Sequence, residues 1–371
     1  MVVTSHMWNL YTRSSAMPGV SGFLTNWLEN GHLWVDVFIV ISGFCLMLPV
    51  TRFRTIRGGW QTFYKSRARR ILPPFYAAVG FALALALLHH HHLSAALILS
   101  NLLLLQDVWP QSLLLDGPLW SVALEWKIYF LFPLFVWFWL RFGSRAVLIA
   151  SGVLSLFLLA LYVHLKFIPD LSLACPWYVF LFALGMVSAD FTQRGEYSAK
   201  EQRQGVPRAW CALAAALALD WVMMHCSPLS SSSEQRDKVR VLLLPLSDCL
   251  VGLAVAALLF LLHHSAASQS KNTPLTFVRL LLSWRPLVFI GTFSYSIYLI
   301  HLLLVYDLGS RLIVLLHTNN PIIIIPIDVM LVLPCAYLFH LIFERPFMTK
   351  PGVKIKTEAQ AEAAAVVNPA P

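Results

Sequence analysis

Long apolar runs alternate with short polar segments along almost the whole chain. An α-helix rises 1.5 Å per residue, so about 20 apolar residues cross the hydrocarbon core of a bilayer. The segments that reach or approach this length are 33–50, 71–88, 119–140, 146–163, 177–191, 209–226, 239–262, 287–305 and 322–343. The segment 94–105 is apolar but short, which favours a re-entrant or interfacial piece. The pattern predicts an all-α polytopic membrane protein.

The two ends of the chain complete this prediction. The residues from Met1 to about Tyr11 look like the tail of a tenth span, truncated on its N-terminal side, so about ten transmembrane helices are expected. The first residues do not follow the order of a cleavable signal peptide. The tail 351–371 is rich in Ala, Lys, Glu and Pro and is expected to be disordered and cytoplasmic. Residues 1–350 are expected to form one transmembrane domain, with no soluble domain.

Composition agrees with the apolar pattern. Hydrophobic residues make up 58% of the 371 residues and charged residues only 12%, far below the share in a soluble domain. The formal net charge is +9, but the basic residues lie in short segments between apolar runs. That placement favours a role in membrane orientation and argues against a nucleic-acid partner. The six cysteines show no CxxC pair and no metal-ligand spacing, so no metal is expected.

The distribution of lysine and arginine predicts the orientation of the spans. If the 51–70 loop is cytoplasmic and the spans alternate, 20 of these residues lie on the cytoplasmic side and 6 on the outer side, with Lys127 inside a span. This asymmetry follows the positive-inside rule. The serine-rich loop around Ser230–Ser233 then faces outward. We expect a multi-pass protein of the cell (inner) membrane, surrounded by membrane lipids.

Among the ionisable side chains within the apolar spans, four stand out: His6, Asp36, Glu125 and His301. Inserting such a group costs about 2.5–3.5 kcal/mol on insertion scales, so each requires a reason. In the predicted orientation each lies near the outer end of its span, and Glu125 is the deepest at roughly 9 Å. Each could be satisfied separately by a neighbour or by water. Their common depth favours a shared functional site.

Helical spacing adds further polar residues to this layer. Two sets are spaced so that each occupies one face of a helix. The first set is Ser121, Glu125 and Tyr129. The second set is Ser294, Tyr298 and His301. A polar stripe on an apolar span normally faces protein or water rather than lipid.

A basic element, KSRARRILPP at 65–74, precedes the second apolar span. One interpretation is that it sets the topology and contacts lipid head groups. A sharper interpretation is an anion site, because arginines three apart at a helix end can bind phosphates in a bidentate manner. Arg67 and Arg70 have this spacing.

At these segments the sequence resembles the acyltransferase-3 family of integral-membrane O-acyltransferases. The resemblance extends from His6 to Pro346. Its elements, in chain order, are WVDVFIVISGF at 34–44, RARRILPP at 67–74, LWSVALE at 119–125, FSYSIYLIH at 293–301 and FERP at 343–346. Each element alone is a weak signal, whereas all five in this order are specific.

The resemblance implies transfer of an acyl group, commonly acetyl, from cytoplasmic acyl-CoA to a hydroxyl of an extracytoplasmic glycan or related acceptor. Acyl-CoA would be a co-substrate, with no permanently bound cofactor. In the family a histidine late in the first span is the proposed base, which His6 matches, and an assisting acid matches Asp36. A donor-linked Arg-x-x-Arg element matches Arg67 and Arg70. The family also carries a basic residue with ten residues between it and the histidine, a position that would lie before Met1.

O-acylation requires a base, a held electrophile and stabilisation of an oxyanion. His6 would take the hydroxyl proton, with Asp36 orienting its ring. A hydroxyl of Ser42, Ser121 or Tyr298 would stabilise the oxyanion. The full set of acceptor-side or supporting candidates is Ser42, Trp120, Ser121, Glu125, Tyr129, Ser294, Tyr298, His301 and Glu344. The chain has no Gly-x-Ser-x-Gly elbow, which argues against a serine acyl-enzyme.

Two other classes of protein remain open from the sequence alone. A membrane transporter also places polar residues within the membrane, but usually shows paired repeats or broken helices, which the sequence does not suggest. The other class is a non-catalytic membrane protein that retains the enzyme fold.

Overall fold

The computed structural model describes residues 2–14, 31–109, 112–113, 115–165, 171–193, 199–226, 233–267, 274–318 and 320–348. This part of the chain consists of helices joined by turns and contains no strand, which confirms the predicted fold class. The predicted disordered tail 351–371 lies outside the described residues. So does the predicted loop around Ser230–Ser233, except for Ser233, where a helix begins.

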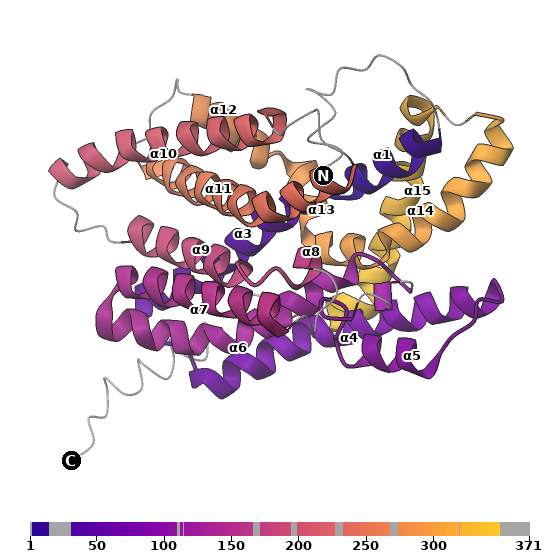
Figure 1. The fold of residues 1–371 in the computed structure, drawn as a ribbon, viewed down its shortest axis with the longest axis horizontal. Coiled ribbons are helices and arrows are strands. Elements are labelled where there is room, and N and C mark those ends of the chain that lie inside the picture. Colours follow the sequence, from indigo (N-terminus) through magenta and orange to yellow (C-terminus); the bar gives the residue numbers. More distant parts are fainter. Residues whose placement is uncertain are drawn as a thin grey trace, which may run out of the picture.

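Figure 1 shows the arrangement of the helices. In chain order they are α1 (Val2–Ser14), α3 (His32–Phe53), α4 (Gly59–Leu88), α5 (Ala95–Leu102), α6 (Leu119–Phe142), α7 (Ser144–Leu165), α8 (Leu171–Ala174), α9 (Tyr178–Gln193), α10 (Ala199–Cys226), α11 (Ser233–Ala267), α12 (Pro274–Leu282), α13 (Arg285–Thr292), α14 (Ser294–Leu316) and α15 (Pro321–Phe339). A π-helical turn (His340–Glu344) and a 3₁₀ turn (Arg345–Phe347) extend α15.

Seven helices of the described part are long and apolar enough to cross a membrane: α3, α4, α6, α7, α11, α14 and α15. The consecutive helices α12 and α13 together meet the same test, but they are bent by 53° and form a broken span or a re-entrant pair. Helix α9 is apolar and has 16 residues. The predicted short segment 94–105 forms the eight-residue helix α5. The described residues therefore support a polytopic protein without fixing the number of spans at ten.

The predicted span 287–305 is wrong in its bounds. Helix α13 ends at Thr292, and α14 begins at Ser294 and continues to Leu316. The hydroxyls of Thr292 and Ser294 donate to the carbonyls of Phe289 and Gly291. Such side-chain bonds compete with the backbone ladder, which is why an apolar run can contain a helix break.

This break changes the position of His301 within its helix. The residue lies seven positions after the first residue of α14, Ser294, and fifteen before the last, Leu316. Its depth near the outer end of a span stays a prediction. His301 lies in the interior of α14, on the side of its N-terminal end.

Helices α3 and α9 approach each other backbone to backbone at two glycines. A Cβ added to Gly43 would lie 2.1 Å from the carbonyl oxygen of Phe182. A Cβ added to Gly185 would lie 2.0 Å from the carbonyl oxygen of Val40. Glycine allows this reciprocal contact, as small residues do at helix interfaces in membranes. The contact fixes the position of Ser42, the neighbour of Gly43, in the core.

Helix α1 lies beside α14 and α15 (Figure 1). The hydroxyl of Tyr11 on α1 donates to Asp328 Oδ2 on α15 at 2.6 Å. Gly309 on α14 leaves room for this tyrosine, because a Cβ there would lie 2.0 Å from the Tyr11 hydroxyl oxygen. The buried side chain of Met7 packs in the same small core. These contacts fix the rotation of α1 and thereby the direction of His6.

Candidate active site

Two histidines from helices at opposite ends of the sequence face each other. The ring centroids of His6 on α1 and His301 on α14 are 5.3 Å apart, with the rings tilted by 41°. His301 is fully buried, and its Nδ1 lies 2.7 Å from the carbonyl oxygen of Tyr298. A carbonyl only accepts, so Nδ1 carries the hydrogen, and Nε2 of the neutral ring is an acceptor. This buried Nε2 has no hydrogen-bond partner. The pair therefore offers one unused basic nitrogen beside a second imidazole.

A buried carboxyl forms a second group in the core. Ser42 Oγ on α3 donates to Glu125 Oε1 on α6 at 2.9 Å, and the Tyr129 hydroxyl donates to the same oxygen. The two hydroxyl oxygens are 2.8 Å apart. All three side chains are buried. Glu125 and Tyr129 share one face of α6, as their spacing predicted, and Ser42 joins them from another helix.

The two candidate donor-binding arginines occupy different positions on α4. Arg67 is partly buried and interacts with Tyr129 and Glu125, and its buried Nε has no hydrogen-bond partner. Its guanidinium carbon lies 5.9 Å from the centroid of the Phe63 ring. Arg70 is exposed. Arg67 therefore points into the bundle toward the Glu125 group, whereas Arg70 is open to an incoming ligand.

Helices α6 and α14 are linked by hydroxyl groups. Ser121 Oγ lies 2.6 Å from the Tyr298 hydroxyl, which donates to the carbonyl of Pro118 at 2.8 Å. The Tyr298 ring is 5.8 Å from the His301 ring, centroid to centroid. Ser121 is also one helical turn before Glu125, on the same face of α6. The polar groups thus form a series through the bundle from Arg67, through the Glu125 group and the Ser121–Tyr298 pair, to His301 and His6.

Ser294 and Glu344, both predicted from the sequence, lie outside this series. Ser294 is exposed, and its hydroxyl donates to the carbonyl of Gly291 at the start of its own helix. Glu344 is buried and accepts from Ser296 Oγ at 2.6 Å, and His340 Nδ1 lies 2.8 Å from the same carboxyl. Ser296, rather than Ser294, is the buried serine of this stretch. Glu344 ties the end of α15 to the start of α14.

Asp36 is fully buried, and neither of its carboxylate oxygens has a hydrogen-bond partner. The groups that interact with Asp36 most strongly are Asp248 and Tyr178. The Tyr178 hydroxyl itself lies 3.1 Å from another group, His32 Nε2. None of the described contacts joins Asp36 to His6. The orienting role of Asp36 toward that histidine therefore stays a prediction.

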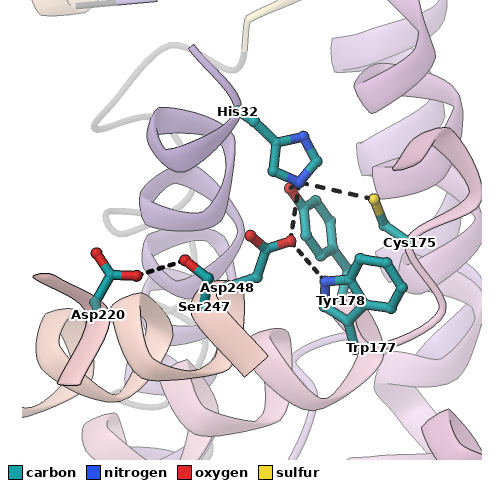
Figure 2. A network of polar contacts seen from close by, with 7 residues as sticks. All are labelled: His32, Cys175, Trp177, Tyr178, Asp220, Ser247 and Asp248. Carbon is teal, nitrogen blue, oxygen red and sulfur yellow. Dashed lines mark hydrogen bonds and ion pairs between the residues drawn. The ribbon is translucent and has the colours of Figure 1, made fainter. Parts of the chain in front are cut away.

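A polar cluster that the sequence reasoning missed surrounds His32 (Figure 2). His32 Nε2 lies 2.9 Å from Asp248 Oδ2, and Trp177 Nε1 donates to the same oxygen at 2.7 Å. Trp120 stacks on the His32 ring with centroids 5.6 Å apart and planes 12° apart. Asp248 was visible in the sequence as an acid within the apolar run 239–262. His32 gave no such signal, because it precedes the apolar run 33–50 and resembled a loop residue.

The turn between α5 and α6 holds two buried carboxyls. Asp107 pairs with Lys127, which explains the lysine inside a predicted span. Burial raises the pKa of the Asp107 carboxyl, and the ammonium of Lys127 opposes this shift. Burial raises the pKa of the Asp116 carboxyl well above its usual range, and neither of its oxygens has a hydrogen-bond partner. Asp116 also interacts with Tyr298, so the turn reaches the polar series.

The fold and the site together define a polytopic helical membrane protein with a buried polar site assembled from several helices. The family model described as an acyltransferase domain matches residues 1–341. The chain therefore belongs to the acyltransferase-3 family of membrane proteins, which confirms the resemblance seen in the sequence.

Two bacterial relatives are also similar to the chain. O-acetyltransferase OatA of Staphylococcus aureus is 30% identical over 178 residues, which cover 42% of this chain and 29% of that protein. The putative peptidoglycan O-acetyltransferase YrhL of Bacillus subtilis is 24% identical over 309 residues, which cover 74% of this chain and 44% of that protein. The chain thus spans less than half the length of these curated relatives. No solved structure matches it.

Proposed function

We propose that the chain transfers an acetyl group from acyl-CoA to a hydroxyl of a glycan outside the cell (inner) membrane. The observation that carries this proposal is the pair formed by the partly buried His6 and the buried His301, placed at one end of a polar series that begins at Arg67. A neutral imidazole held against a second one in a water-poor core is the kind of group that takes a hydroxyl proton, and the unused Nε2 of His301 is available to orient it. The names of the relatives, an O-acetyltransferase and a putative peptidoglycan O-acetyltransferase, support acetyl as the group and a glycan as the acceptor.

The donor approaches from the end of the bundle that carries Arg67 and Arg70. The positive-inside rule assigns this end to the cytoplasm. The exposed guanidinium of Arg70 binds the phosphates of acyl-CoA, where bidentate hydrogen bonds are available. Arg67 lies between these phosphates and Glu125. The acyl group and the pantetheine chain that carries it therefore extend along the polar series into the core.

His6 is the base in this proposal. One ring nitrogen of His6 removes the acceptor proton as the hydroxyl oxygen attacks the thioester carbonyl. The new C–O bond forms, the C–S bond breaks, and the proton passes to the departing CoA thiolate. In the reacting complex the other nitrogen of His6 turns to donate to His301 Nε2, which has no hydrogen-bond partner in the structure because the ring hydrogen is held at Nδ1 by Tyr298. His301 is therefore better placed than Asp36 to orient His6.

The stabiliser of the oxyanion is one of three hydroxyls, those of Ser42, Ser121 and Tyr298. Of the three residues, Tyr298 is the one with a described contact to His301, with ring centroids 5.8 Å apart. Its hydrogen is donated to the Pro118 carbonyl, and that of Ser42 to Glu125. A reorientation of one hydroxyl during the reaction supplies the donor that the oxyanion requires.

The bent pair α12 and α13 favours transport as a second candidate function, because broken helices are common in transporters. One experiment separates the two. Proteoliposomes containing the purified chain receive acetyl-CoA labelled on the acetyl group on one side and peptidoglycan fragments on the other. Acyl transfer gives labelled glycan esters and CoA thiol in equal amounts. Movement of labelled acetyl-CoA across the bilayer without ester formation would overturn the proposal in favour of transport.

A further inference from the structure

Three residues that are distant in the sequence place different ligand atoms together at the N-terminal end of α3 (Figure 2). His32 begins α3, Cys175 follows α8, and Asp248 lies within α11. One ligand atom from each lies within 4.8 Å of the others. His32 Nε2 is 2.9 Å from Asp248 Oδ2 and 3.9 Å from Cys175 Sγ. Imidazole nitrogen, cysteine sulfur and carboxylate oxygen are the three ligand types of zinc.

The charges around this cluster favour a bound cation. Asp36 lies beside Asp248, and both of its buried oxygens lack a hydrogen-bond partner, as does Asp248 Oδ1. Asp220, held by Ser247 at 2.5 Å, adds a third carboxyl nearby. The groups that interact most strongly with Asp36 are acids and a tyrosine, and none of them carries a positive charge. Buried carboxylates are costly unless they are paired or coordinate a metal.

We propose that His32, Cys175 and Asp248 bind a divalent transition-metal ion of the zinc type, with Asp36 as the nearest further carboxylate. Tetrahedral coordination at ordinary zinc bond lengths separates nitrogen, oxygen and sulfur ligands by about 3.3–3.6 Å. The two separations from His32 Nε2, 2.9 and 3.9 Å, reach this range by shifts of a few tenths of an ångström. The third, between Cys175 and Asp248, lies within 4.8 Å and reaches it by a shift of at most about 1.2 Å. Binding displaces the proton of the Cys175 thiol to solvent, and the thiolate and the Asp248 carboxylate balance the charge of the ion.

The surroundings already orient the proposed ligands. Trp177 donates to the coordinating oxygen of Asp248, and Trp120 stacks on His32. Such outer contacts hold metal ligands in place and tune their basicity. The Tyr178 hydroxyl, now 3.1 Å from His32 Nε2, is also close to Asp36 and can turn to it when the nitrogen takes a metal. The His32 side chain is 22% exposed, so an ion has access from one side.

Metal analysis of the purified full chain tests this site. The protein in detergent is stripped with a chelator, loaded with Zn²⁺, washed, and analysed by mass spectrometry for metal content. We expect about one equivalent of zinc, and a loss of affinity of at least about 100-fold in Cys175→Ser and in Asp248→Asn, beyond the range of outer-contact effects. The matched control is Cys249→Ser, which removes a thiol next to Asp248 that is not part of the cluster.

Cobalt provides a second measurement that depends on the thiolate. The Co²⁺-loaded chain and its Cys249→Ser variant are expected to show a thiolate-to-metal charge-transfer band that Cys175→Ser lacks. If Asp248→Asn does not fold, His32→Gln replaces it, because this partly exposed position at a helix start tolerates substitution. Absence of stoichiometric zinc in the folded parent chain, or equal zinc retention in the cluster variants, would leave His32 and Asp248 as an ion pair only and overturn the site. Neither measurement requires acyl transfer, so the result is independent of the proposed function.

Discussion

His301 holds its imidazole against that of His6 with the ring centroids 5.3 Å apart, and its own hydrogen is committed to the carbonyl of Tyr298. The geometry depends on a distant anchor, the hydrogen bond between Tyr11 and Asp328 that fixes the rotation of α1. Two imidazoles with different hydrogen-bond partners can have different roles in base catalysis. In the proposed mechanism one ring accepts the proton, and the other fixes its orientation.

The close contact of α3 and α9 predicts a steep dependence on side-chain size at Gly43. In Gly43→Ala the new Cβ meets a backbone carbonyl at 2.1 Å, so the helices must separate. We expect a loss of about 3 kcal/mol or more in the free energy of unfolding, in the range of overpacked cores. Thermal unfolding in detergent measures it. The matched control is Gly80→Ala on α4, where a Cβ meets nothing within 4 Å and helix propensity favours alanine by up to about 1 kcal/mol. Equal stability of the two variants would contradict the packing described.

Arg67 and Arg70 are predicted to bind the donor. Replacing both with Ala removes charge-assisted hydrogen bonds worth about 1.5–3 kcal/mol each, so the Kd for CoA should rise by at least about 10-fold. Titration calorimetry with CoA measures it, and expression should change little. Arg69→Ala is the matched control, because Arg69 is exposed, lies next to Arg70 and keeps its place in the basic segment. Unchanged CoA affinity in the double variant would contradict donor binding by these arginines and leave the segment with a role in membrane topology only.

The bias of basic residues predicts that Thr55 is cytoplasmic and Ser230 is outside the cell. Single cysteines at these two positions, in a variant without the native cysteines, should react differently with a membrane-impermeant maleimide. In intact cells only Ser230→Cys should be labelled, and after permeabilisation both should be. Labelling of both cysteines from the same side would refute the orientation and, with it, the direction of acyl transfer.

Asp116 makes stability fall as the pH rises. Burial raises the pKa of this carboxyl in the folded state, so the folded chain binds more protons than the unfolded chain above the ordinary carboxyl pKa of about 4. Its contribution is complete below pH 4 and is lost as the pH rises through the folded-state pKa. Asp116→Asn should therefore be more stable than the parent chain at neutral pH, with the difference vanishing near pH 4.

The paired carboxyl of the same turn serves as the comparison. Asp107→Asn removes the partner of Lys127 and should destabilise the chain at neutral pH. Thermal unfolding of both variants across this pH range checks the contrast. If Asp116→Asn lowers the unfolding temperature as much as Asp107→Asn, the Asp116 carboxyl is satisfied in the folded protein and does not oppose folding at neutral pH.

Residues on one helix were readable from the sequence, because periodicity fixes what shares a face. The spacing of Ser121, Glu125 and Tyr129 predicted such a face, and these residues do contribute to one polar series. Partners from different helices were not readable. Neither the contact of Ser42 with Glu125 nor the approach of Cys175 to His32 leaves a spacing signal.

The bounds of α14 were missed for a related reason. Hydropathy measures where a chain can enter lipid, but a helix can extend beyond the apolar run and begin within it. The break at Phe293 is produced by local hydroxyl–carbonyl bonds, which average hydropathy does not register. His301 is buried with an unused nitrogen, and both its depth in the membrane and its functional role stay predictions.

The proposed mechanism depends above all on His6 as the base and His301 as its orienting partner. The most direct test is the rate of acetyl transfer from labelled acetyl-CoA to glycan, in a preparation whose unsubstituted chain is active, for His6→Ala, His301→Ala and Asp36→Asn. We predict that His6→Ala loses turnover at the upper end of the roughly 10²–10⁴-fold that general-base catalysis supplies, with donor binding unchanged. His301→Ala should lose less and shift the pH profile, and Asp36→Asn should also lose less than His6→Ala. Near-normal acetyl transfer by a folded His6→Ala protein would contradict the assignment of His6 and leave His301 as the base.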